Sequence, residues 1–290
     1  MSTAHSSYYL PNPSPWPVIT SAGLFSLALG TVLTINGIKA GPWLMALGVA
    51  IIVTMMFRWF GQVVGESESG TYNAQVDRSF RWGMAWFIFS EVMFFAAFFG
   101  ALFYIRQFAV QWIGSDDLLW PGFSATWPTA GPKGPLPVTP GMIPGANQFS
   151  PMGAWGIPAI NTLILLSSGV TVTWAHQAIR DGDRKNLILG LWATVILGAT
   201  FTCLQAFEYS HAAFGFTDTI YASTFYMATG FHGAHVIIGT IFLTVCLIRS
   251  YMGHFTPTHH FGLEAASWYW HFVDVVWLFL FTFIYWDPFF

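Results

Sequence analysis

Seven long apolar runs constrain the fold of this chain more than any other feature. Each holds roughly 20 or more mainly apolar residues, the length of helix that crosses the hydrocarbon core of a bilayer. The runs cover residues 17–38, 42–64, 81–108, 156–176, 187–209, 220–248 and 265–286. Because backbone polar groups in lipid must pair within the chain, such runs indicate helices rather than strands. The sequence therefore predicts an all-α, polytopic membrane protein with seven transmembrane helices.

The charge content supports this class and excludes others. Only 8% of the 290 residues are charged, whereas soluble domains have about 25%. A soluble enzyme is therefore excluded, and a disordered chain is excluded by the 54% of hydrophobic residues. The net charge of −3 provides no basic surface, so no nucleic-acid partner is expected.

The connections between the runs suggest two bundles. A polar stretch follows the second run and separates it from the other five. We therefore expect an N-terminal segment with a two-helix bundle at 1–66, a polar linker at 67–80 and a five-helix bundle at 81–290. Within the last, residues 109–155 form a long loop rich in Pro, Gly and Trp. If the N-terminus is cytoplasmic, seven of the ten Lys and Arg residues lie on that side, which the positive-inside rule favours.

One carboxyl lies in the middle of an apolar run. Glu91 follows Arg81 by ten residues, about 15 Å along a helix and half of the hydrocarbon core. Neighbouring Phe side chains favour the neutral form of the acid. Intramembrane ionisable groups are functional candidates. Glu91 is thus either a proton-active, reagent-reactive carboxyl or a protonated one that hydrogen-bonds a neighbouring helix.

Histidines in the C-terminal half raise the question of a metal site. His232 and His235 share a helix face at a spacing of three, and Glu208 with His211 forms one ExxH pair of the di-iron kind. Further histidines are His254, His259 and His260. A di-iron bundle needs two ExxH pairs and two more Glu, so the ligand set is incomplete. We expect no metal here, and these side chains to bond within the bundle or meet lipid headgroups; a stand-alone membrane di-iron oxygenase is an alternative.

A second polar pair lies in the last apolar run. His271 and Asp274 are also three residues apart and share one helix face. Such a pair can neutralise itself as a structural polar clamp, or it can bridge to another subunit or transfer protons.

Residues near the ends of two other runs are candidates for binding lipid. Arg249 ends the sixth run, and an arginine there can bind a headgroup phosphate or simply extend to the interface. Together with Glu66, Trp59 and Phe60 near the end of the second run, it predicts a headgroup pocket.

Three motifs resemble those of cytochrome c oxidase subunit III, a family of heme–copper oxidase subunits. Residues 225–243 (FYMATGFHGAHVIIGTIFL) resemble the sixth-helix signature, residues 259–279 (HHFGLEAASWYWHFVDVVWLF) the last-helix signature, and residues 89–95 (FSEVMFF) the third-helix carboxyl motif. The resemblance covers essentially the whole chain, and the two C-terminal motifs are long and specific.

The resemblance implies a non-catalytic subunit. In this family subunit III binds no heme or copper; these cofactors belong to subunits I and II, which reduce oxygen with electrons from cytochrome c and pump protons. Cytochrome c docks on subunit II. Subunit III stabilises subunit I, supports proton uptake and holds phospholipid in a cleft between a two-helix and a five-helix bundle.

Individual residues take their family roles from the same resemblance. Glu91 matches the carbodiimide-reactive carboxyl. Glu66, His232, His235 and Arg249 match positions near bound phospholipid or in the same bundle. No catalytic residue is expected in this chain.

The sequence also departs from the mitochondrial members. They usually carry His-His-Thr after the second helix, where this chain reads GTYN at 70–73. The long loop at 109–155 resembles bacterial members, which implies the inner membrane of a bacterium, with a cytoplasmic N-terminus and a periplasmic C-terminus. A quinol oxidase subunit III and a proton-conducting carrier centred on Glu91 are the remaining alternatives.

Overall fold

The computed structural model describes residues 9, 13–115, 123, 125, 127–128 and 151–286. All regular elements in this part are helical. Seven helical stretches are long and apolar enough to cross a membrane: Trp16–Ile35, Gly41–Glu68, Ala74–Gly114, Ile157–Arg180, Arg184–Ser210, Ile220–Met252 and Phe261–Trp286. The prediction of an all-α protein with seven membrane-spanning helices is confirmed.

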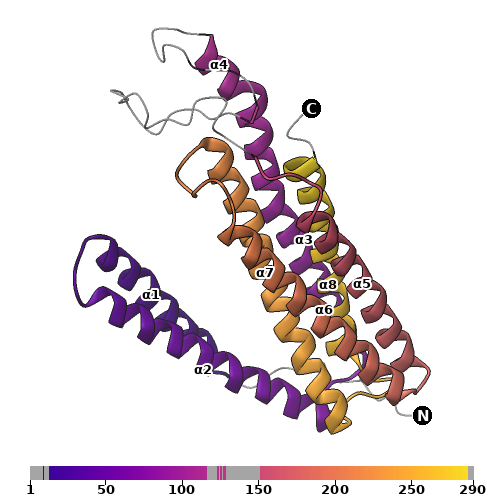
Figure 1. Cartoon of the computed structure of the whole chain (residues 1–290). Helices are drawn as coiled ribbons and strands as arrows, with labels where there is room; N and C mark the ends of the chain where they lie inside the picture. The colour runs from indigo at the N-terminus through magenta and orange to yellow at the C-terminus, as the bar shows by residue number, and fades with distance from the viewer. Residues whose placement is uncertain are drawn as a thin grey trace, which may run out of the picture. The chain divides into compact units, whose positions relative to one another are not determined.

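These stretches correspond to the labelled elements of Figure 1. The first two are α1 and α2, and the fourth to sixth are α5, α6 and α7. The third stretch joins α3 (Ala74–Tyr104), η1 (Ile105–Ala109) and α4 (Val110–Gly114), and the last joins α8 (Phe261–Leu280) and η2 (Phe281–Trp286). Both η segments are π-helical turns.

The chain divides into two compact units, Met1–Phe80 and Arg81–Phe290. Of the predicted linker at 67–80, only residues 69–73 lie outside helices. The reason is local: α2 continues to Glu68, and Asn73 caps α3 by accepting a hydrogen bond from the Val76 N–H at 3.0 Å. The start of the predicted loop at 109–155 is helical as far as Gly114, and most of its remainder lies outside the described residues.

The first unit is a hairpin of α1 and α2, whose backbones approach closely (Figure 1). A Cβ atom added to Gly30 would lie 2.5 Å from the Met45 nitrogen, and one added to Gly48 would lie 2.6 Å from the Leu27 nitrogen. Small residues at helix interfaces in membranes allow this approach and the dispersion contacts that follow from it.

The second unit is built around four helices that pack in a closed cycle. In sequence order α5, α6, α7 and α8 pack each on the next, and α8 returns to α5 (Figure 1). The helix that includes α3 joins them through side chains: Arg81 Nη2 lies 2.8 Å from Glu264 Oε2, and the ring of Phe95 lies 6.0 Å from that of Phe272. This arrangement places α3 against the start and middle of α8.

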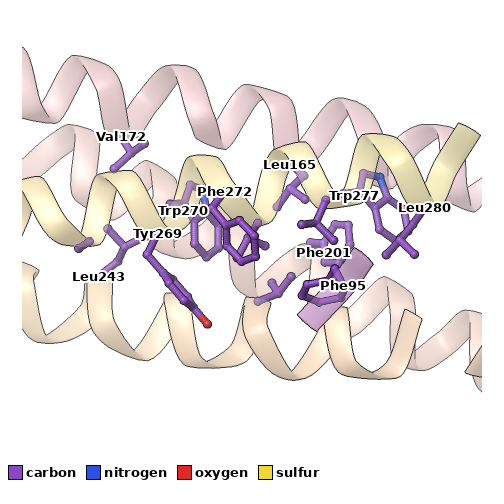
Figure 2. Close-up of a cluster of buried hydrophobic side chains, with 14 of the residues drawn as sticks. Phe95, Leu165, Val172, Phe201, Leu243, Tyr269, Trp270, Phe272, Trp277 and Leu280 are labelled. Atoms are coloured by element: carbon purple, nitrogen blue, oxygen red, sulfur yellow. The ribbon is translucent and has the colours of Figure 1, made fainter. Parts of the chain in front are cut away.

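The core of this unit follows the buried face of α8 (Figure 2). Trp270 and Trp277 are fully buried, and each indole N–H has an acceptor on α5: Ser168 Oγ at 2.8 Å and Thr162 Oγ1 at 2.9 Å. A buried indole needs such a partner. The two tryptophans therefore fix both the packing and the register of α8 against α5.

Burial differs strongly among the spans. The apolar windows of α1, α2 and α3 are each 11% buried inside the protein, whereas that of the last span is 56% buried. The exposed side chains on the first three spans are large and apolar, as with Phe25, Trp43 and Trp86. These faces match a surrounding of lipid or of another membrane protein, because the apolar surface is too extensive for water.

Candidate functional site

The intramembrane carboxyl has a specific partner. Glu91 on α3 and His235 on α7 meet with 2.9 Å between Glu91 Oε2 and His235 Nε2. Both side chains are largely but not fully buried, with exposed fractions of 21% and 13%. The rings of Phe94 and Phe95 flank the imidazole, at centroid distances of 5.8 and 5.0 Å. The structure thus joins two residues that the sequence analysis singled out separately.

The hydrogen bond of the other ring nitrogen of His235 determines how many protons the Glu91–His235 pair carries. Nδ1 lies 2.7 Å from the Phe231 carbonyl oxygen, which can only accept, so Nδ1 carries a proton. One more proton then lies between Nε2 and the carboxyl of Glu91. The pair is either a neutral acid donating to a neutral imidazole or a carboxylate facing an imidazolium. In both forms a single proton lies in the hydrogen bond that joins α3 to α7.

His232 shares its helix with His235 but points elsewhere. Its side chain is 1% exposed, Nε2 donates to the Val273 carbonyl at 3.1 Å, and the ring packs 5.1 Å from that of Trp277. The core of the bundle encloses this imidazole. His232 therefore packs inside this bundle.

In the first unit, Glu66 is the centre of a hydrogen-bond cluster. Its carboxylate accepts from Tyr72 OH at 2.7 Å and Gln62 Nε2 at 2.8 Å, with Tyr9 OH at 3.4 Å. Burial, then the hydrogen bond to Glu66, raises the pKa of Tyr72 above its ordinary value, so this phenol remains a donor at physiological pH. The cluster joins the end of α2 to the short turn before α3.

Two aromatic side chains lie one to two turns before this cluster. Trp59 and Phe60 on α2 are both exposed, and their rings stack with centroids 6.1 Å apart. They provide an apolar surface at the Glu66 end of the helix.

Arg249 occupies the end of α7 in the second unit. Its guanidinium lies over the ring of Phe255 at 4.5 Å from the centroid, a cation–π contact. Phe255 follows the left-handed Gly253, with φ of 81°, that ends α7. The arginine is therefore held against the turn between α7 and α8.

The other predicted polar pair, His271 and Asp274, contacts α5 of the same chain. His271 Nδ1 lies 3.6 Å from Asp274 Oδ2, and His271 Nε2 lies 3.0 Å from Thr173 Oγ1 on α5. Asp274 is buried, and a side chain at Gly169 would collide with its carboxyl. The carboxyl therefore faces α5 of the same chain, while half of the His271 side chain is exposed.

The side chains of the predicted ExxH pair, Glu208 and His211, bind different partners. Glu208 Oε1 accepts from Tyr285 OH at 2.8 Å, whereas His211 Nδ1 lies 3.0 Å from the Phe207 carbonyl at the end of its own helix. Within the described residues, no group of three or more His, Cys, Asp or Glu side chains could hold a metal ion. The Glu208–Tyr285 contact and the Arg81–Glu264 ion pair were not anticipated, because contacts across 77 and 183 residues have no local sequence signal.

Comparison with known proteins agrees with this architecture. The family model for cytochrome c oxidase subunit III matches residues 5–131 and 136–288. A cytochrome c oxidase subunit 3 from Marchantia polymorpha is 48% identical over 280 residues, covering 96% of each chain. One from Arabidopsis thaliana is 47% identical over 281 residues, covering 97% of this chain and 96% of the relative. A probable cytochrome c oxidase subunit 3 from Rickettsia bellii is 44% identical over 281 residues, covering 96% and 94%. The chain belongs to the cytochrome c oxidase subunit III family.

Proposed function

We propose that the chain is a non-catalytic core subunit of a proton-pumping cytochrome c oxidase. It packs in the membrane with subunits I and II, which carry the heme and copper, and electrons enter from cytochrome c at subunit II. The observation that supports this role is the burial pattern of the spans: three apolar helices have only 11% of their windows covered by the chain itself. Partner subunits and phospholipid would cover such faces.

Phospholipid binding is the second part of the proposal. In the first unit, Trp59 and Phe60 offer exposed rings to acyl chains, close in sequence to the polar cluster of Glu66. In the second unit, Arg249 at the end of α7 brings a guanidinium to the expected headgroup level, where arginine binds phosphate in bidentate fashion. In this proposal His235 binds Glu91 and does not contact lipid directly. His232 has a structural role in the bundle core.

The third part of the proposal is support of proton uptake and of subunit I. The Glu91–His235 pair holds one exchangeable proton between α3 and α7, within an apolar surrounding. Loss of the pair would also loosen the contact of α3 with the rest of its unit, so Glu91 contributes to stability through its hydrogen bond and to proton supply through its acidic group.

Lipid retention tests the role of these side chains in the intact oxidase. We expect Arg249→Ala and Trp59→Ala to retain fewer phospholipids per purified complex and to lose activity sooner during turnover. Trp43→Ala is the matched control, because Trp43 is an exposed tryptophan at the opposite end of the same helix as Trp59. Mass spectrometry counts the phospholipids retained per complex. Equal counts in the three variants and in wild type would contradict the lipid role.

A further inference from the structure

A buried polar cluster lies where α6 ends and the last helix turns into η2. It consists of Gln205 and Glu208 on α6 and Tyr285 on η2, all nearly or fully buried. Tyr285 OH donates to Glu208 Oε1 at 2.8 Å, and Gln205 Nε2 donates to Tyr285 OH at 3.3 Å. The function proposed above assigns no role to this cluster.

Two atoms of the cluster have no hydrogen-bond partner within the described residues. They are Glu208 Oε2 and Gln205 Oε1, both shielded from solvent. Glu208 is 3% exposed and Gln205 5% exposed. Buried polar atoms in proteins are almost always paired, either with other groups or with ordered water. The two orphaned oxygens therefore point to a small ligand between or beside them.

The protonation state of Glu208 follows from its surroundings. An ionised carboxylate inside a membrane bundle needs a cation or several donors. The one donor that the described residues give to Glu208 is a neutral phenol. A proton on Oε2 removes the charge and turns that orphaned acceptor into a donor, while Gln205 Oε1 remains an acceptor that needs a donor.

More unpaired atoms occur nearby in the same bundle. The ring of Trp277 packs 5.6 Å from Tyr285 and 5.1 Å from His232. His232 Nδ1, an acceptor because Nε2 donates to Val273, is also buried without a partner among the described residues. With Oε2 of Glu208 protonated, the three atoms are one donor and two acceptors, so a neutral molecule that can both accept and donate matches them, whereas a cation would repel the acidic proton.

We propose that Gln205, Glu208 and Tyr285 form a buried hydration site, in which Glu208 is a protonated acid and a water molecule bridges its Oε2–H to Gln205 Oε1. The water accepts from the acid and donates to the amide oxygen, so both orphaned atoms are satisfied and the site carries no net charge. Tyr285 supplies the other hydrogen bond to the acid and ties η2 to α6.

Infrared spectroscopy of the assembled oxidase tests the protonation. The difference spectrum between wild type and Glu208→Gln should show the loss of one carbonyl band of a protonated carboxylic acid, and this band should shift in D₂O. Tyr285→Phe, which removes only a hydroxyl, should keep the band and move it to higher frequency. If the difference spectra show carboxylate bands instead, or if Tyr285→Phe leaves the band in place, the assignment is wrong.

An experimental density map of the same complex tests the ligand. Ordered density for water within hydrogen-bonding distance of Glu208 Oε2 and Gln205 Oε1 would support the site. An empty, dry site would overturn it, and so would a bound sodium or potassium ion whose occupancy follows the salt present.

Discussion

At the scale of residues, the pairing of Glu91 with His235 is the most informative contact in the chain. The two side chains are 144 residues apart in sequence, and their hydrogen bond crosses from α3 to α7. The carbonyl of Phe231 defines the tautomer of His235, so Nε2 accepts whenever the imidazole is neutral. A group that can donate at position 91 will therefore preserve the bond, whether or not it can give up a proton.

Because the tautomer of His235 is defined, two substitutions at Glu91 can distinguish an effect on stability from an effect on proton transfer. Glu91→Gln retains an amide donor for His235 Nε2 and should unfold close to wild type, whereas Glu91→Ala leaves that nitrogen unpaired, at a cost of about 1–3 kcal/mol. Both variants should lose carbodiimide labelling and keep initial oxygen reduction. Glu91→Gln should slow proton uptake at nearly unchanged stability. Thermal unfolding, carbodiimide labelling, initial oxygen consumption and stopped-flow proton uptake measure the four outcomes.

Two results would contradict this account. Equal destabilisation by the two substitutions would mean that the hydrogen bond to His235 does not form in the oxidase. Complete loss of initial activity in an intact complex would indicate a direct catalytic role for Glu91.

Much of the candidate site could be anticipated from composition and local spacing, but its connections could not. Low charge content made Glu91 conspicuous, since a carboxyl amid Phe side chains is rare. Its partner was predicted only as a group on a neighbouring helix, because helical spacing places His232 and His235 on one face without saying which neighbour each meets. Their different surroundings, core for one and α3 for the other, are set by tertiary packing.

At the scale of elements, glycine determines how closely α1 and α2 approach. Gly48 lies against the backbone of Leu27, which cannot move as a side chain can. The spans themselves were predictable from length and hydropathy, whereas their ends were not: α3 begins well before the apolar run at 81–108, since the Asn73 cap starts the helix in polar sequence.

A larger side chain at that contact should separate the hairpin. We expect Gly48→Val to destabilise the two-helix unit by about 1–3 kcal/mol or more, the usual cost of overpacking. Gly61→Val in the same helix is the control, because no atom lies within 4 Å of a Cβ there. Disulfide crosslinking between cysteines placed on α1 and α2 reports the separation. Equal crosslinking in both variants would argue against close packing at Gly48.

At the scale of the whole molecule, the described residues contain seven candidate spans, and if each crosses the membrane once, the start of the first and the end of the last lie on opposite sides. The excess of Lys and Arg predicts a cytoplasmic N-terminus. With this orientation in a bacterial inner membrane, we expect the connection after α1 to face the periplasm and the connection after α2 to face the cytoplasm. Exposed residues in these two connections, Lys39 and Ser69, make the orientation testable.

Labelling of introduced cysteines should distinguish the two sides. With a membrane-impermeant thiol reagent added to intact cells or spheroplasts, Lys39→Cys should react at once and Ser69→Cys only after permeabilisation. The reverse order would place the N-terminus outside.

The central claim is that this chain assists a reaction carried out by its neighbours in a cytochrome c oxidase. Affinity purification of the chain from its native membrane, with metal and heme analysis of each separated subunit, tests it most directly. We predict that two further subunits accompany it, that heme and copper are found in those subunits, and that phospholipid is retained with the complex. Stoichiometric heme, copper or iron in this chain on its own, with no oxidase subunits attached, would contradict the claim.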